Sequence, residues 1–171
     1  PHPVSQIVIG DRQHARDEAF FRLRDIRYVI NCTPPRTEGG VNNFFENLHS
    51  KSGTTPVPQI EYLRLPMQDN ASEKLYPSFQ SAFEFLERVA VREDGRVLVN
   101  CNQGLSRSVA VVIAYLMRYF GLGYDDSLYL GREGRESAKP NAGFELQLRE
   151  YEAIWEKGGG GYREGEYLEG Y

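Results

Sequence analysis

Apolar residues recur along this chain with two different periods. Four short segments have the apolar or alternating pattern that is typical of strands, namely residues 7–10, 28–32, 61–66 and 97–100. Glycine or proline closes or soon follows the first three, which predicts that each of these strands ends in a turn.

Longer segments between the strands have the period of an amphipathic helix. The first begins at Asp11, a candidate N-cap, and ends at Arg24, while residues 106–120 are apolar nearly all round, as in a buried central helix. Further helices are expected at residues 78–90, 124–135 and 141–157, the last with Asn141 as its cap. Strands that alternate with helices predict a single α/β domain, with a mainly parallel central sheet flanked by helices.

Two stretches depart from this pattern. Residues 33–59 are rich in proline, glycine, asparagine, serine and threonine, and a structureless loop of that length is uncommon, so we expect a short helix at 42–48. After residue 157 come four glycines and an acidic, tyrosine-rich peptide, a composition typical of a flexible segment. We therefore expect one folded domain at 1–157 and a separate tail at 158–171.

Composition narrows the class of protein. The net charge of −4 argues against nucleic acid as a partner, and no apolar run approaches the roughly 20 residues that cross a membrane. Two cysteines and three histidines without paired spacing predict neither a metal site nor a cofactor. Without a signal-peptide pattern, the expected location is the cytoplasm, with the nucleus as a further possibility.

The segment VLVNCNQGLSRSV, residues 97–109, joins a strand to the buried helix through a tight loop. Loop amides and a helix N-terminus together bind anions and lower the pKa of a cysteine thiol. Cys101 is then a nucleophile, Arg107 holds phosphate oxygens in its planar fork, and Gly104 lets the backbone approach the ligand. Ser108 could donate to the sulfur when the thiolate leaves.

An alternative is a cysteine that only packs, beside an arginine paired to a surface carboxylate. That alternative requires the glycine, the arginine, the strand and the helix to coincide by accident. The pattern therefore favours a phosphate-binding loop with a reactive thiolate.

The sequence CNQGLSRS resembles the C-x5-R-S loop of the protein tyrosine phosphatase superfamily, and VLVNCNQGLSRSVAVVIAYLM is similar to its dual-specificity branch. IVIGDRQHARD, IRYVINCTPP, YLRLPMQD and KPNAGFELQL resemble further segments of that branch, in the same order, so the resemblance covers about residues 5–157. It implies a catalytic domain at 1–157 that works through a phosphocysteine on Cys101, with Asp69 as general acid. The residues expected to bind phosphate are Asn102, Gln103, Gly104, Leu105, Ser106 and Arg107.

One position departs from that family pattern. Histidine usually precedes the nucleophile, and this chain has Asn100, which can support the loop as a donor but carries no charge. We therefore expect a slower enzyme with a higher optimal pH.

The residues of the loop at 101–108 indicate the substrate class. The loop contains no lysine to meet a multiply phosphorylated lipid, so phosphotyrosine and phosphoserine or phosphothreonine in proteins are the expected substrates. The alternative is a low-activity pseudophosphatase that binds phosphorylated partners. Basic residues at Arg132, Arg135 and Lys139 form either a second anion site or an ordinary charged surface.

Three tail tyrosines lie among glutamates: Tyr162, Tyr167 and Tyr171. The tail is either a solvated peptide, a regulatory phosphorylation segment or a pseudo-substrate that contacts a phosphatase pocket, in its own or a neighbouring molecule.

Overall fold

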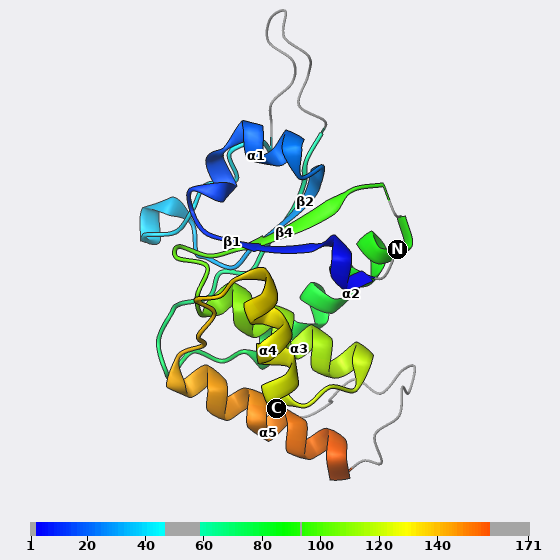
Figure 1. Cartoon of the computed structure of the whole chain (residues 1–171). Coiled ribbons are helices and arrows are strands. Elements are labelled where there is room, and N and C mark those ends of the chain that lie inside the picture. The colour runs from blue at the N-terminus through cyan, green and yellow to red at the C-terminus, as the bar shows by residue number, and fades with distance from the viewer. Residues whose placement is uncertain (1–2, 47–58, 93, 158–171) are drawn as a thin grey trace, which may run out of the picture.

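A four-stranded parallel sheet forms the centre of the molecule (Figure 1). The computed structural model describes residues 3–46, 59–92 and 94–157. The sheet order is β1-β4-β2-β3, with β1 at Ile7–Gly10, β2 at Ile26–Asn31, β3 at Glu61–Arg64 and β4 at Arg96–Asn100. All three pairings are parallel, which confirms the predicted α/β class and brings the carboxyl ends of the strands to one edge.

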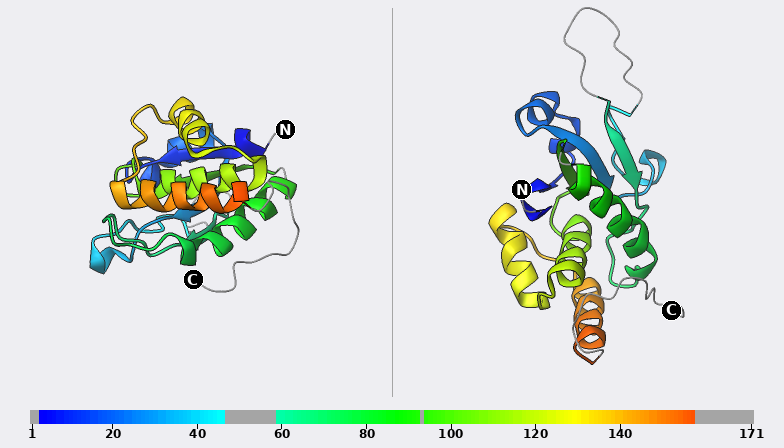
Figure 2. Two further views of the ribbon diagram at one scale, coloured as in Figure 1. Left: turned by 90° about the horizontal axis from the view of Figure 1, so that it is seen from below. Right: turned by 90° about the vertical axis from the view of Figure 1, so that its right-hand side faces the viewer.

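Helices cover both faces of this sheet. Helix α1 (Glu18–Leu23) packs on one face, and α2 (Tyr76–Arg92), α3 (Arg107–Phe120) and α4 (Tyr124–Gly134) lie on the other. Helix α5 (Ala142–Lys157) runs along the outer side of α3, away from the sheet (Figure 2). Three short 3-10 helices complete the described elements: η1 at Pro3–Gln6, η2 at His14–Arg16 and η3 at Arg36–Glu38.

The expected helix at 11–24 is two elements. Asp11 accepts backbone hydrogen bonds from Gln13 and His14 and so supports η2, whereas Asp17 accepts from the Phe20 N–H and caps α1. The chain breaks between them because Asp17 is extended, with φ −89° and ψ 100°. Asp11 is therefore a turn residue and not the N-cap of a long helix.

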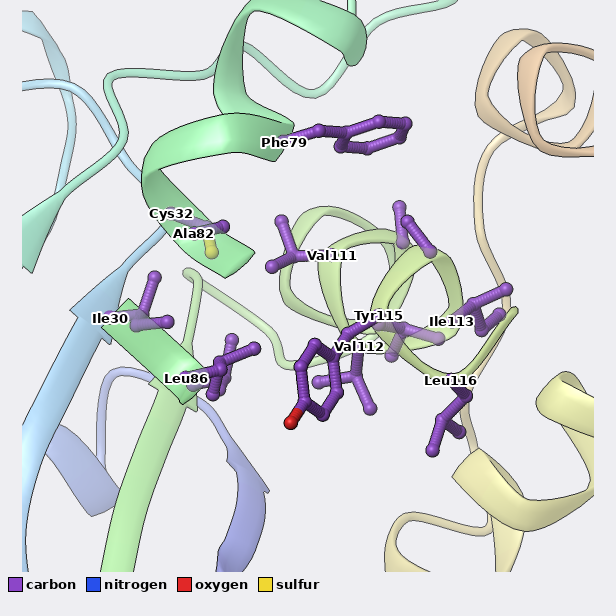
Figure 3. Packing of buried hydrophobic residues seen from close by; sticks show 14 of the residues in the cluster. Ile30, Cys32, Phe79, Ala82, Leu86, Val111, Val112, Ile113, Tyr115 and Leu116 are labelled. Carbon is purple, nitrogen blue, oxygen red and sulfur yellow. The ribbon is translucent and has the colours of Figure 1, made fainter. Parts of the chain in front are cut away.

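Helix α3 is buried because it lies between the sheet, α2 and α5. Val109 to Leu116 are almost fully enclosed, which confirms the prediction of a central helix that is apolar all round. Figure 3 shows Val111 and Tyr115 of α3 gathered with Leu86 of α2 and Ile30 of β2. This packing fixes the direction in which the N-terminus of α3 points.

Part of the long stretch at 33–59 is described, and there the chain is held by buried polar groups. Thr33 Oγ1 donates to Asn31 Oδ1 and accepts from the Val41 N–H. Residues 44–46 form a turn where a helix at 42–48 was expected, and residues 47–58 lie outside the described residues, as does the tail at 158–171. Among the described helices, none is long and apolar enough to span a membrane.

Candidate functional site

The loop from Cys101 to Ser106 connects the carboxyl end of β4 to the N-terminus of α3. Cys101 is 1% exposed, its Sγ lies 3.3 Å from Ser108 Oγ, and the Gly104 N–H donates to the same sulfur over 3.2 Å. Gly104 has φ +67°, and a Cβ there would lie 2.6 Å from the Gly10 carbonyl oxygen. Only glycine allows the loop to close this tightly against the end of β1.

The loop turns its carbonyl groups outward. Three carbonyl oxygens accept hydrogen bonds from outside the loop: Asn102 O from Arg12 N, Gln103 O from Arg135 Nη2 and Leu105 O from Lys139 N. In a trans peptide the carbonyl and the next N–H point in opposite directions. The N–H groups of Gln103, Gly104 and Ser106 therefore face the inside of the loop, as the Gly104 bond to sulfur demonstrates.

The surroundings of Cys101 favour its thiolate. Burial by itself raises the pKa of the thiol, but hydrogen bonds from Ser108, the charge of Arg107 and the Gly104 N–H outweigh it, so that the pKa lies below the usual value. A thiolate is the nucleophilic form of cysteine.

Arg107, the first residue of α3, is 5% exposed and lies beside the sulfur. Its Nη1 donates to the Met67 carbonyl over 3.1 Å, and its Nε lies 3.8 Å from Asp69 Oδ2, outside hydrogen-bonding distance. Within the described parts of the chain, this buried Nε has no hydrogen-bond acceptor. A free donor in a site with inward N–H groups fits an oxyanion.

Asp69 lies in the loop between β3 and α2, and the fold brings it to Arg107. Asn141 holds the other carboxylate oxygen, donating from Nδ2 to Asp69 Oδ1 over 3.0 Å. The same residue caps α5 through the Phe144 N–H, as predicted, and donates from its N–H to Ser106 Oγ. Asn141 therefore ties the loop at 101–106, α5 and the Asp69 loop together, a role that its position as a helix cap did not indicate.

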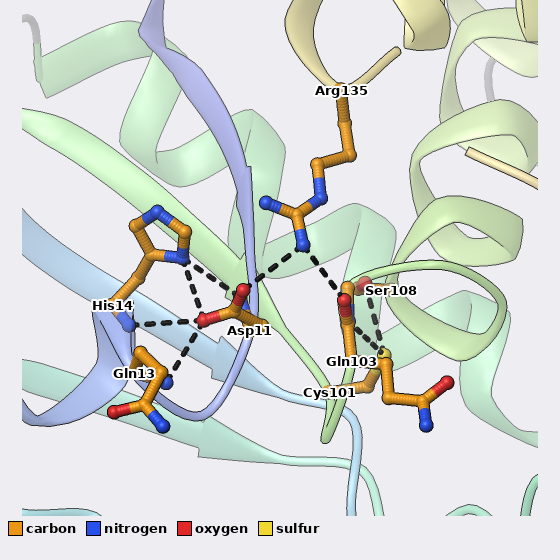
Figure 4. A network of polar contacts seen from close by, with 8 residues as sticks. Asp11, Gln13, His14, Cys101, Gln103, Ser108 and Arg135 are labelled. Carbon is orange, nitrogen blue, oxygen red and sulfur yellow. Dashed lines mark hydrogen bonds and ion pairs between the residues drawn. The ribbon is translucent and has the colours of Figure 1, made fainter. Parts of the chain in front are cut away.

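A second set of polar contacts fixes the loop from the side of β1 (Figure 4). Arg135, at the end of α4, donates both to Asp11 Oδ2 and to the Gln103 carbonyl, each over 2.9 Å. His14 Nδ1 lies 2.8 Å from the other oxygen of Asp11. Arg132 Nε donates to the Ala138 carbonyl. Arg135 thus supports the loop from behind, which favours the alternative to a second anion site at 132–139.

Asn100 is fully buried next to Cys101, and neither its Nδ2 nor its Oδ1 has a hydrogen-bond partner among the described residues. The main chain of Asn100 is hydrogen-bonded, because its carbonyl oxygen accepts from the Cys32 N–H over 2.8 Å. The carboxamide is therefore not seen supporting the loop, and its expected effect on Cys101 stays a prediction.

The variant Asn100→His tests that effect. A histidine that becomes protonated beside Cys101 favours the thiolate, so the acidic limb of kcat/KM should move to lower pH, by about one pH unit. The pH dependence of aryl phosphate hydrolysis measures this limb. Asn100→Ala is the control, because it removes the carboxamide without adding a charge; an equal shift in both variants, or none in Asn100→His, would contradict the prediction.

Comparisons with known proteins identify relatives of this chain. The family model described as "Dual specificity phosphatase, catalytic domain" matches residues 7–154. Tyrosine-protein phosphatase vhp-1 of Caenorhabditis elegans is 42% identical over 148 residues, which are 86% of this chain and 20% of that protein. The human serine/threonine/tyrosine-interacting protein is 45% identical over 96 residues, 56% of this chain and 43% of that protein. The chain thus spans less than half the length of these two curated relatives.

Two solved structures are similar over nearly their whole length. Human DUSP28 superposes with a TM-score of 0.71 at 26% identity, over 90% of this chain and 96% of that one. The human tyrosine phosphatase-like serine/threonine/tyrosine-interacting protein gives a TM-score of 0.73 at 30% identity, over 90% and 95% of the two chains.

Proposed function

Because this chain belongs to the dual specificity phosphatase catalytic domain family, we propose that it hydrolyses phosphotyrosine and phosphoserine or phosphothreonine esters in proteins. The observation that supports this most directly is the Cys101 sulfur, which contacts Ser108 Oγ and the Gly104 N–H; against the effect of burial, these contacts and the charge of Arg107 bring its pKa below the usual value. In this proposal residues 1–157 form the catalytic domain, and residues 158–171 are a linker and tail.

In the first step, Cys101 Sγ attacks phosphorus and a P–S bond forms while the P–O bond of the ester breaks. The inward N–H groups of the loop and the Arg107 guanidinium hold the three phosphoryl oxygens, on which charge develops. Asp69, next to Arg107, gives its proton to the leaving oxygen. The products are a phosphocysteine and the free hydroxyl side chain.

In the second step, water attacks the phosphocysteine. Asp69, now a carboxylate, takes a proton from that water, and the P–S bond breaks to release phosphate and the Cys101 thiolate. Ser108 Oγ, 3.3 Å from the sulfur, donates a hydrogen bond to this leaving thiolate. The two steps together use the Cys101 sulfur, the N–H groups of the loop, Arg107, Asp69 and Ser108, and the scheme needs no metal or cofactor.

Proteins are the proposed substrates because loop residues 102–106 contain no lysine or arginine. Arg107 alone does not supply enough positive charge to match a multiply phosphorylated inositol ring. Similarity to vhp-1, a tyrosine-protein phosphatase, is consistent with protein substrates.

Turnover of a small aryl phosphate between about pH 5 and pH 9, with rapid acid quenching to trap phosphate on the Cys101 peptide, tests the proposal. A phosphorylated Cys101 peptide during turnover supports the mechanism. Turnover without that adduct under single-turnover conditions would count against it.

The second candidate function is a binder of phosphorylated partners with little turnover. The buried carboxamide of Asn100, which has no hydrogen-bond partner among the described residues, favours it. Similarity to the human serine/threonine/tyrosine-interacting protein also favours it. Tight phosphopeptide binding without hydrolysis of any aryl phosphate or phosphopeptide would select this candidate.

Replacing Asp69 with asparagine is expected to lower kcat for a phosphopeptide by about a hundredfold or more, because the leaving hydroxyl then departs without a proton. Steady-state kinetics of the parent chain and of Asp69→Asn with the same phosphopeptide measure this loss. Glu73→Gln is the matched control, since Glu73 accepts from the Gln68 N–H in the same loop. Equal losses in both variants would contradict the role of Asp69.

The tail is proposed to contact a phosphatase pocket through its tyrosines and glutamates at 158–171. If it competes with substrate, deletion of 158–171 should lower KM for a phosphopeptide and leave kcat unchanged. Steady-state kinetics of the truncated and full chains measure this, and an unchanged KM together with unchanged product inhibition would remove the idea.

A further inference from the structure

A basic cavity of about 410 Å³ lies beside the phosphate loop, and the proposed mechanism does not use it. Its lining comprises Arg12, Arg16, Arg36, Gly39, Gly40, Val41, Asn42 and Phe44. The three arginines come from two separate segments, one leading into and through η2 and the other in η3. A volume of this size is typical of ligand sites.

The side chains of the three arginines that line this cavity are exposed. None of the three makes a side-chain hydrogen bond or an ion pair with any described residue, whereas Arg64, Arg135 and Arg149 are each engaged by neighbouring groups. No aspartate or glutamate lines the cavity. A chain of net charge −4 thus gathers three arginines in the lining of one cavity.

Two residues that line the cavity are hydrogen-bonded to Asn102 of the phosphate loop. The Arg12 N–H donates to the Asn102 carbonyl, and Asn102 Nδ2 donates to the Gly39 carbonyl over 3.3 Å. An anion in the cavity and a phosphate on Cys101 would therefore lie on either side of Asn102. One ligand that carries two anionic groups could fill both.

The wall formed by residues 33–43 is held firmly in place. Arg64 donates four hydrogen bonds into it, to the carbonyls of Thr33, Pro34 and Val41 and to Asn43 Oδ1. A Cβ on Gly40 would lie 1.7 Å from the Pro34 oxygen, so the close turn requires glycine. A site whose backbone is already ordered loses less conformational entropy when it binds.

Phosphate suits this lining better than a carboxylate does. Three guanidinium groups present planar donor forks, and a phosphate offers three oxygens and up to two charges. Phe44, 41% exposed at the rim, offers an apolar contact of the kind that a peptide side chain makes.

We propose that Arg12, Arg16 and Arg36 form a second anion subsite, which holds another phosphate of the same phosphopeptide whose ester lies at Cys101. Hydrolysis of the ester at Cys101 rests on the proposed function. Binding at the subsite does not, because the arginines would hold a doubly phosphorylated peptide with or without turnover.

Binding is measured with the full chain carrying Cys101→Ser, by fluorescence anisotropy at near-physiological ionic strength. The ligands are singly and doubly phosphorylated peptides with a series of spacings between the phosphates, and peptides with glutamate in place of the second phosphate. At one or more spacings the second phosphate should lower Kd by about tenfold, or ~1.4 kcal/mol. Glutamate should give a smaller gain.

The same measurement on Arg16→Gln/Arg36→Gln should abolish that preference and leave binding of the singly phosphorylated peptide nearly unchanged. Arg24→Gln is the matched control: it removes an exposed arginine that does not line the cavity. A small aryl phosphate contacts the loop and does not reach the cavity. Its kcat/KM, measured with Cys101 unchanged, therefore reports whether each arginine variant keeps the loop intact.

Several results would overturn the subsite: no preference at any spacing, a preference that survives the double variant, or equal weakening for both peptides. Loss of binding to vesicles containing phosphoinositides, with no change for peptides, would assign the arginines to a lipid surface instead. If the doubly phosphorylated peptide binds as expected but the parent chain hydrolyses nothing, the subsite stands and the proposed hydrolysis fails.

Discussion

Cys101→Ser should lower kcat for a small aryl phosphate by at least about a thousandfold. The serine hydroxyl has no accessible anionic form near neutral pH, whereas contacts from Ser108, Arg107 and Gly104 keep the pKa of the Cys101 thiol below its usual value. Binding of phosphopeptide should persist, because the inward N–H groups and Arg107 remain. Steady-state kinetics and anisotropy measure the two effects separately.

Cys32→Ala is the matched control for this variant. Cys32 is the other buried cysteine, directly after the strand beside β4, and its pKa is raised well above the usual value, with burial as the largest cause. It is therefore a neutral thiol and no nucleophile, and its removal should leave kcat within a few-fold of the parent value. Comparable losses in both cysteine variants would indicate damage to the core instead of loss of a nucleophile.

The second large effect is expected at Arg107. Arg107→Lys keeps the positive charge but replaces the three nitrogens of the planar fork with one. A single ammonium nitrogen cannot both reach the Met67 carbonyl and hold two phosphoryl oxygens in bidentate geometry. We expect kcat/KM to fall by about a hundredfold, and the affinity for vanadate, which resembles the transition state, to fall with it. Kinetics with vanadate as an inhibitor measure both quantities.

Arg118→Lys makes the same chemical change near the other end of α3 and should leave both quantities unchanged. If Arg107→Lys lowers kcat/KM while vanadate binds as before, Arg107 acts by positioning other groups and not by holding the transferring phosphoryl group. Full activity in Arg107→Lys would contradict the proposed mechanism.

Local pattern was enough to determine most elements of the fold. The four strands, the buried helix at Arg107–Phe120 and the capped helix beginning after Asn141 lie within about two residues of their expected positions. The spacing of apolar residues and the residues that end each element are contained in consecutive positions of the chain. The alternation of strands with helices then predicts a parallel sheet. Cys101, Gly104, Arg107 and Ser108 could be found for the same reason, since one short loop contains them all.

Two local expectations were wrong where neighbouring signals competed. Asp11 and Asp17 are both good helix caps, and the sequence pattern alone did not tell which of them begins α1. Residues 44–46 turn instead of entering a helix, in a segment held by Asn31, Thr33 and Arg64 from elsewhere in the chain. Such contacts override a weak helical preference.

What the tertiary structure decided lies in contacts between segments far apart in sequence. Asn141 meets Asp69 across 72 positions, and Arg135 meets Asp11 across 124, so neither pairing has a local signal. The arginine cavity is likewise assembled only when η2 and η3 meet at the carboxyl edge of the sheet. The sequence by itself located the loop from Cys101 to Arg107, because its residues are contiguous. The structure determined what surrounds that loop, because packing joins residues that periodicity cannot relate.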